Sequence, residues 1–66
     1  MEITLNGEKV NLEKSYSLNQ IIDIYDMNRE TVVVEVNGNL PEKTEYDTIY
    51  PTEGDVIELI RFVGGG

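Results

Sequence analysis

The chain of 66 residues contains no cysteine, no histidine and no tryptophan. Without cysteine there is no disulfide framework, no thiolate nucleophile and no thiolate metal site. Without histidine the chain lacks the commonest general base and the commonest metal ligand. A single domain of this length buries only about 60% of the surface that its unfolded form exposes, so it cannot hold both a core and a large enclosed active site. Catalysis by this chain alone is therefore not expected.

Long apolar runs and an excess of basic residues are missing as well. No apolar run reaches the ~18 residues of a membrane span, and no basic-then-apolar leader opens the chain, so we expect a cytoplasmic protein without a membrane partner. Thirteen acidic residues outnumber five basic ones and give a net charge of -8. Such a surface repels phosphate backbones, so nucleic acid is not an expected partner. The charge fits either plain solubility or steering toward a basic partner.

Carboxylate groups offer little further chemistry. Asp23 with Asp26, and Glu42 with Glu45, are candidate acid–base pairs, but both pairs fall on expected solvent faces. The acidic stretch 42–55 lacks the alternating ligand spacing and central glycine of a calcium-binding loop. We therefore expect the chain to bind no metal and no cofactor of its own.

The first half of the chain predicts a β-hairpin followed by a helix. Apolar and polar residues alternate over 1–12 on both sides of Asn6-Gly7, a dipeptide that favours a two-residue turn. Ser17 and Gln20 have the spacing of a capping box, and Tyr16 with Ile21 has staple spacing. The helix stripe comprises Leu18, Ile21, Ile22 and Tyr25. Asn28 is a plausible left-handed stop for this helix.

The second half predicts two more strands around an irregular connection. The β-branched run 31–36 places Val32, Val34 and Val36 on one face and Val33 and Glu35 on the other. Asn37-Gly38 is a second turn signal. Pro41 fits the first turn of a short helix or 3₁₀ turn, residues 49–50 have the pattern of a short edge strand, and 53–55 form a turn.

The last predicted strand covers 56–63. Ile57 and Leu59 share one parity, while Val56, Glu58, Ile60 and Phe62 share the other. The whole pattern predicts an α+β fold of the order β-β-α-β-β, with one helix on one face of a mixed sheet. We expect a single domain over 1–66.

The sequence ends in Gly64, Gly65 and Gly66. These glycines add nothing to a core, but an arm of three residues extends to about 10 Å and fits a channel too narrow for side chains. We expect a flexible tail at 64–66, whose unhindered α-carboxylate on Gly66 another enzyme can activate as an acyl-adenylate. A frayed end or an artificial addition is the alternative that the sequence leaves open.

The topology, the small acidic domain and the terminal Gly-Gly together resemble the ubiquitin-like β-grasp family and, more closely, the ThiS-type sulfur carrier proteins of thiamine biosynthesis. The likeness covers essentially the whole chain and rests on the segments MEITLNGE, VVVEVNGNLP, EGDVIELI and VGGG. The small subunit of molybdopterin synthase is similar in kind. It is usually longer, however, and often carries a proline-containing segment before its tail that this chain lacks.

The resemblance implies a mechanism and a set of partners. A ThiF-type enzyme would adenylate the Gly66 carboxylate with ATP and magnesium. A sulfur donor such as a cysteine desulfurase would then supply the sulfur of a thiocarboxylate, and a ThiG-type thiazole synthase would use it. Gly64 and Gly65 would form the arm.

By the family's use of the exposed sheet face, the residues that would bind the partner are Ile60, Phe62, Val63, Val33 and Glu35. Exposed apolar residues that cluster in this way are typical of an interface. Three other uses of the same scaffold stay open at this point: sulfur supply to molybdopterin, covalent modification of proteins, and non-covalent binding with an idle tail.

Overall fold

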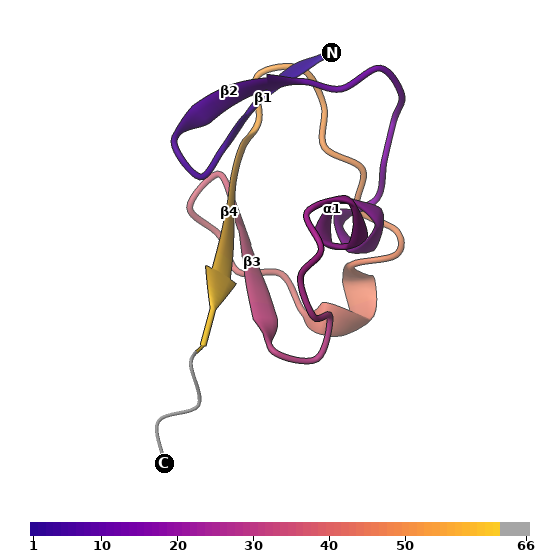
Figure 1. The fold of residues 1–66 in the computed structure, drawn as a ribbon, viewed down its shortest axis with the longest axis vertical. Coiled ribbons are helices and arrows are strands. Elements are labelled where there is room, and N and C mark those ends of the chain that lie inside the picture. Colours follow the sequence, from indigo (N-terminus) through magenta and orange to yellow (C-terminus); the bar gives the residue numbers. More distant parts are fainter. Residues whose placement is uncertain (63–66) are drawn as a thin grey trace.

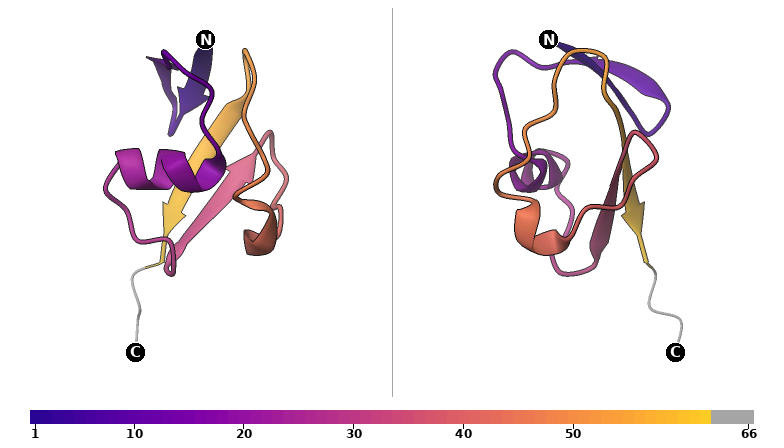
Figure 2. Two further views of the ribbon diagram at one scale, coloured as in Figure 1. Left: turned by 90° about the vertical axis from the view of Figure 1, so that its right-hand side faces the viewer. Right: turned by 180° about the vertical axis from the view of Figure 1, so that it is seen from behind.

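The structure is a computed structural model that describes residues 1–62 of the chain. A four-stranded mixed sheet of order β2-β1-β4-β3 carries one helix, α1, across one face (Figures 1 and 2). The pairing of β1 with β4 is parallel, and the other two pairings are antiparallel. The elements are β1 (Glu2–Leu5), β2 (Glu8–Asn11), α1 (Leu18–Ile24), β3 (Val32–Val36), a 3₁₀ turn η1 (Lys43–Glu45) and β4 (Val56–Arg61). The predicted order and layers are confirmed.

The β1–β2 turn is formed by the residues that the sequence marks for it. Asn6 and Gly7 adopt φ angles of 50° and 84°, the left-handed values that a two-residue hairpin turn requires. Asn6 also fastens this turn to β4. Its backbone N–H donates to the Ile57 carbonyl at 2.9 Å, and its side-chain oxygen accepts from the Leu59 N–H at 2.8 Å.

A capping box starts α1, as the sequence predicts. The Ser17 hydroxyl accepts from the Gln20 N–H at 3.2 Å, and the Gln20 side chain accepts from the Ser17 N–H at 2.9 Å. These two bonds satisfy donors that a helix N-terminus otherwise leaves free. Within the predicted stripe, Leu18, Ile21 and Ile22 are buried, whereas Tyr25 is 39% exposed.

The end of α1 differs from the prediction. The helix stops at Ile24, and Asp26 rather than Asn28 takes the left-handed conformation, with φ of 55°. Asn28 serves the next turn instead, because its side-chain oxygen accepts from the Glu30 N–H at 2.8 Å. Both residue types tolerate this conformation, so local sequence alone does not decide between them.

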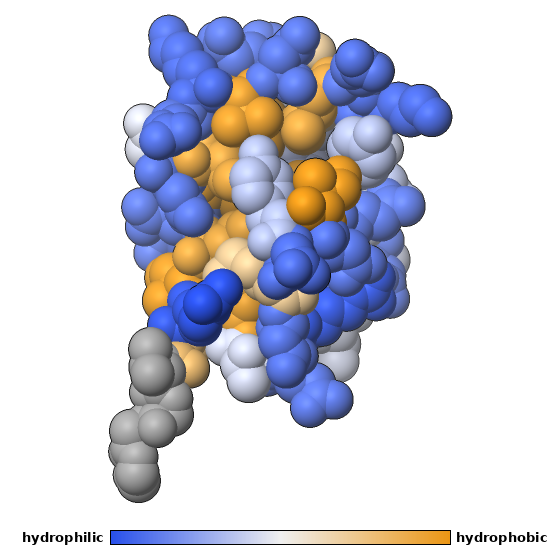
Figure 3. Space-filling view, viewed as in Figure 1, coloured by the Kyte–Doolittle hydropathy of each residue, from blue (hydrophilic) through white to orange (hydrophobic). Residues whose placement is uncertain are grey.

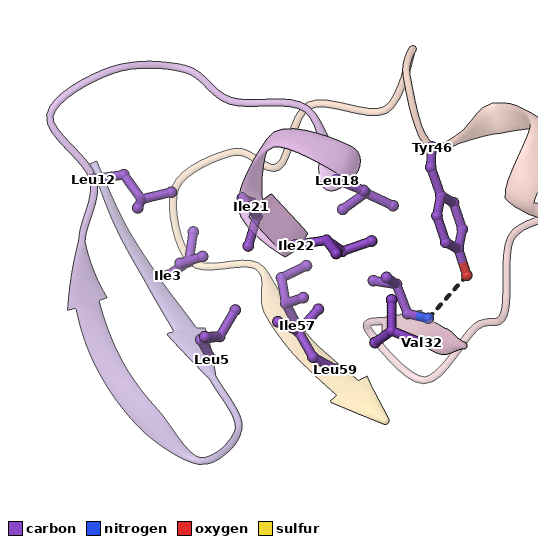
Figure 4. Packing of buried hydrophobic residues seen from close by; sticks show 11 residues of the cluster. Ile3, Leu5, Leu12, Leu18, Ile21, Ile22, Val32, Tyr46, Ile57 and Leu59 are labelled. Atoms are coloured by element: carbon purple, nitrogen blue, oxygen red, sulfur yellow. Dashed lines mark hydrogen bonds between the residues drawn. The ribbon is translucent and has the colours of Figure 1, made fainter. Parts of the chain in front are cut away.

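The core lies between α1 and the sheet, and Figure 4 shows its side chains converging there from α1 and from β1, β3 and β4. Its buried members are Ile3, Leu5, Leu12, Leu18, Ile21, Ile22, Val32, Val34, Tyr46, Ile57 and Leu59. Tyr46, just after η1, is the one aromatic among them, and the sequence patterns did not single it out. Its hydroxyl accepts from the Val34 N–H at 2.9 Å, which gives a buried polar group a partner (Figure 4).

The outer edge of β3 is closed by bonds from outside the sheet. The donors and acceptors are Val32 N–H with Asn28 C=O, Val34 N–H with the Tyr46 hydroxyl, and Val36 N–H with Asn39 C=O, at 3.0, 2.9 and 2.8 Å. With these donors occupied, a further strand has no ladder to join on this side.

The edge strand predicted at 49–50 is accordingly wrong, since this segment has no strand structure. The Ile49 carbonyl instead accepts from the Leu18 N–H at 3.0 Å and so supports the first turn of α1. The predicted turn near Pro41 is found two residues later, as η1, and the turn at 53–55 is confirmed by Gly54, whose φ is 85°.

β4 shows the predicted alternation. Ile57 and Leu59 are buried, whereas Val56 and Glu58 are exposed. The strand ends at Arg61, before the predicted limit at 63; of the two residues beyond it, Phe62 is outside the strand and Val63 lies outside the described residues. No helix within 1–62 has the length and apolar character needed to cross a membrane.

Candidate functional site

The face of the sheet opposite α1 carries three of the five residues predicted to bind a partner, Val33, Glu35 and Ile60, and Phe62 follows in the parity of Ile60 just after the strand. Register places Val33 directly opposite Ile60, and Glu35 directly opposite Glu58, across the β3–β4 pair. No helix covers this face in the described part of the chain (Figure 2). We call it the helix-free face: Val33 and Glu35 of β3, Glu58 and Ile60 of β4, and Phe62.

The apolar part of the helix-free face lies at the end of β4. Val33 and Ile60 are partly buried, and Phe62, one residue after the strand, is 63% exposed. Successive side chains of a strand point to opposite faces of the sheet. Leu59 faces the core, so Ile60, the next residue, points away from it, as its parity predicts. A large exposed aromatic beside a cross-strand apolar pair is the composition expected of an interface centre.

The acidic part of the same face consists of Glu35 and Glu58. Like charges placed directly opposite each other across two strands destabilise the sheet. Within residues 1–62 the one ion pair joins Arg29 to Asp23, so neither glutamate is neutralised by that part of the chain. Sequence reasoning named Glu35 but missed Glu58 as a site residue. Its parity was visible in the sequence, but its position opposite Glu35 depends on the β3–β4 register, which was not.

A compact set of hydrogen bonds fixes the start of β4. The Asp55 carboxylate accepts from the Thr52 N–H at 2.8 Å and from the Asn37 side-chain amide at 3.0 Å. These bonds, that from Thr52 first, lower the pKa of Asp55 below its usual value. The Asn37 side-chain oxygen in turn accepts from the Val56 N–H at 2.8 Å. Asp55 therefore has a structural role as an ionised acceptor.

One side chain of each candidate acid–base pair has a structural partner. Arg29 donates two hydrogen bonds to Asp23, at 3.0 and 2.6 Å, and its side-chain hydrogen bonding lowers the pKa of Asp23. Glu45 accepts from the Glu42 N–H at 3.2 Å as part of the cap of η1. Over residues 1–62 there is no enclosed pocket, and no three acidic side chains gather as metal ligands would. The carboxylates of this region thus do not assemble into a reaction centre.

The predicted reactive group lies beyond the described residues. Val63, the arm residues Gly64 and Gly65, and Gly66 all fall outside 1–62. The structure does show where β4, the last strand before these residues, ends. The end of β4 lies remote from the N-terminus (Figure 1). Arg61 is the last residue of that strand, and both it and Phe62 are exposed. The roles predicted for 63–66 stay predictions.

Comparison with known proteins identifies the scaffold. The model of the ThiS family matches residues 1–66. The sulfur carrier protein ThiS of Bacillus subtilis is 32% identical over 65 residues, covering 97% of this chain and 98% of that protein. A thiazole synthase of Magnetococcus marinus is 35% identical over 66 residues, covering 100% of this chain but 20% of that protein.

Among solved structures, the crystal structure of the thiamine biosynthesis protein ThiS from Geobacter metallireducens has a TM-score of 0.84 and 29% identity to this chain. The match covers 100% of both chains. The mixed four-stranded sheet with one helix is therefore a ubiquitin-like β-grasp, and the chain belongs to the ThiS family.

Proposed function

We propose that this protein is a sulfur carrier of thiamine biosynthesis and acts as a substrate of other enzymes rather than as a catalyst. The observation that carries the proposal is the match of the ThiS family along residues 1–66, together with the likeness over nearly full length to the sulfur carrier ThiS of Bacillus subtilis. The structure of residues 1–62 is compatible with a carrier function, since it supplies a scaffold with an exposed sheet face.

The reacting group in this proposal is the α-carboxylate of Gly66. A ThiF-type enzyme joins one carboxylate oxygen to the α-phosphorus of ATP and releases pyrophosphate, with magnesium on the phosphates. The acyl-adenylate formed has AMP as a good leaving group, which a free carboxylate lacks. ATP and magnesium are held by that enzyme, and the carrier itself binds no cofactor. Gly64 and Gly65 bring the carboxylate into a channel that side chains would not fit.

Sulfur enters in the second step. A sulfur nucleophile at the oxidation level of sulfide attacks the acyl carbon, forms the C–S bond and expels AMP, which leaves a thiocarboxylate on Gly66. Where the donor is the persulfide of a cysteine desulfurase, a thiol must also reduce the S–S bond of the acyl disulfide first formed. A thiazole synthase then takes the sulfur. We place these steps in the cytoplasm.

The choice of thiazole synthase as the acceptor has support from the comparisons. The thiazole synthase of Magnetococcus marinus includes a stretch similar to the whole of this chain, which accounts for 20% of its length. Two proteins that act together are often found fused in one polypeptide, and a carrier-like segment joined to a synthase has this arrangement. No comparable observation favours molybdopterin supply or protein modification.

The helix-free face is the proposed docking surface. The tail follows directly in sequence after Ile60, Phe62 and Val63. Val33 is paired with Ile60 across β3 and β4. Glu35 is the predicted polar contact, and a cationic side chain of the partner would relieve its repulsion with Glu58.

Reconstitution with purified partners tests the proposal. The carrier is incubated with a ThiF-type enzyme, ATP, magnesium and sulfide, and is then transferred either to a thiazole synthase with its other substrates or to the large subunit of molybdopterin synthase. We expect thiazole product in the first reaction only. Product in the second reaction alone would assign the carrier to the molybdenum pathway.

A further inference from the structure

β4 has a neighbour on its β1 side over only the first part of its length. The parallel register joins Thr4 to Val56 and Leu5 to Ile57, and it stops there because the chain turns at Asn6. In Figure 1 the β1–β2 hairpin lies above, and β4 runs on below it with no strand beside it on that side. Figure 2 shows the same overhang from the helix side.

The Asn6 side chain makes the last hydrogen bond between the β1 side and β4. Its oxygen accepts from the Leu59 N–H at 2.8 Å, so the N–H of Leu59 faces the β1 side. In an extended strand the carbonyl of a residue lies on the same edge as its N–H, so the Leu59 C=O faces this side too. Within residues 1–62 no backbone donor reaches that carbonyl.

Arg61 presents its backbone to the same open edge. It is paired in register with Val32, but the Val32 N–H donates to Asn28 instead. The two residues therefore form a non-hydrogen-bonded pair, in which the N–H and C=O of Arg61 point away from β3. The N–H of Arg61 has no acceptor within residues 1–62.

The other strand edges show that this exposure is local. Three bonds close the outer edge of β3, as described above. The outer edge of β2 is open at Lys9. The Leu12 N–H donates to the Met1 carbonyl at 2.7 Å, and hydrogen-bonded and non-hydrogen-bonded pairs alternate from there along β1 and β2. Lys9 falls in a non-hydrogen-bonded pair with Thr4, so its N–H points outward. A lysine on an open edge discourages strand pairing, and β2 lies at the far side of the sheet from β3. The open edge of β4, by contrast, runs straight into the chain's last residues.

The geometry points to strand addition at this edge. We propose that the backbone of Leu59 and Arg61 pairs with an extended segment of the enzyme that adenylates Gly66; this rests on the function proposed above. The four residues after Phe62 span at most about 14 Å, so the adenylating centre and the end of β4 are necessarily close. A strand hydrogen-bonded to Leu59 and Arg61 sets the direction in which the tail leaves β4.

The side chains around this edge suit such a contact. In Figure 3, drawn from the open side of β4, apolar side chains gather between the hairpin and the strand's exit. Ile60, on the helix-free face, is partly buried, and Phe62, just after the strand, is exposed. An added strand would cover the free backbone groups while its side chains contact these residues, which combines backbone affinity with apolar selectivity.

Proline substitution tests the pairing. Arg61→Pro removes the N–H that faces the open edge and leaves the β3 ladder intact, because proline is accepted where the missing N–H points to solvent. Arg61→Ala keeps the N–H and measures the contribution of the side chain alone. We expect kcat/KM for adenylation, followed by pyrophosphate release, to be about tenfold lower for Arg61→Pro than for Arg61→Ala. Lys9→Pro, which removes an outward N–H from β2, is expected to match the native chain.

Amide hydrogen exchange provides a second readout that does not depend on a variant's folding. In the native carrier, exchange of the Arg61 amide is expected to slow on binding the adenylating enzyme, while that of Lys9 is unchanged. Equal rates for the two Arg61 variants, or an unprotected Arg61 amide in the complex, would overturn the strand addition and leave the carrier function intact. A native chain that the enzyme neither binds nor adenylates would overturn both.

Discussion

At the level of single residues, the core contains one polar anchor whose removal has a calculable effect. The Tyr46 hydroxyl accepts from the buried Val34 N–H at 2.9 Å. Tyr46→Phe keeps the ring and leaves that N–H without a partner, which costs about 1–3 kcal/mol of unfolding free energy. Urea denaturation measures the loss. Tyr50→Phe, at a site where the ring is 49% exposed, is the matched control and should be close to native. Equal stability of the two variants would show that the bond does not contribute.

Asp55 confers a pH dependence whose sign follows from its hydrogen bonds. Because donation from Thr52 and Asn37 lowers its pKa in the folded protein, the folded state binds fewer protons than the unfolded state. Its contribution to stability is full above the unfolded pKa of about 3.9 and is lost as the pH falls through the folded value. Asp55→Asn should therefore be less stable than the native protein at neutral pH, with the difference shrinking in acid.

Thermal unfolding at several pH values measures this difference. Glu13→Gln removes an equal charge from an exposed side chain and serves as the control. A constant gap between native protein and Asp55→Asn across the acid range would contradict the role given to the ionised carboxylate.

At the level of elements, the sequence predicted the turns and the helix cap, which depend on interactions between residues close together in the chain. Asn6-Gly7, Asn37-Gly38 and the Ser17–Gln20 box act within a few residues, and all are found as predicted. The strand proposed at 49–50 failed for a non-local reason. The outer edge of β3, one of the two edges of the sheet, is already occupied by Asn28, Tyr46 and Asn39, and no sequence pattern reports that occupancy.

The site shows the same division. Parity alone put Ile60, Val33 and Glu35 on the outer face, and the structure confirms that placement. The Glu35–Glu58 opposition and the open edge at Leu59 and Arg61 depend on strand register and on where β1 ends. Both are tertiary facts, so the sequence could not show them.

The helix-free face gives a prediction about docking. Phe62→Ala should weaken binding to the adenylating enzyme by about 1–2 kcal/mol, because an exposed aromatic at an interface centre contributes strongly. Its stability should stay within about 0.5 kcal/mol of native, since Phe62 is 63% exposed. Binding is measured by titration calorimetry. Leu40→Ala, at an equally exposed leucine outside the strands, is the control. Unchanged affinity for Phe62→Ala would remove this residue from the interface.

At the level of the whole molecule, the proposed function divides fold and reactivity along the chain. The helix, the hairpin and the turn that precedes β4 form the scaffold in residues 1–62. The ionisable groups with shifted pKa values there are engaged in structural bonds. The chemistry of a sulfur carrier is assigned to Gly66. The net charge of -8 also makes encounter with a basic partner surface faster at low ionic strength.

The central claim is that the Gly66 carboxylate becomes a thiocarboxylate, and intact mass spectrometry tests it most directly. The native chain and a chain with one alanine added after Gly66 are each incubated with a ThiF-type enzyme, ATP, magnesium and sulfide. We predict that the native chain gains the mass of one oxygen replaced by sulfur, and that the extended chain, with the same fold, gains nothing. An unchanged native mass, or the same gain in both chains, would contradict the account.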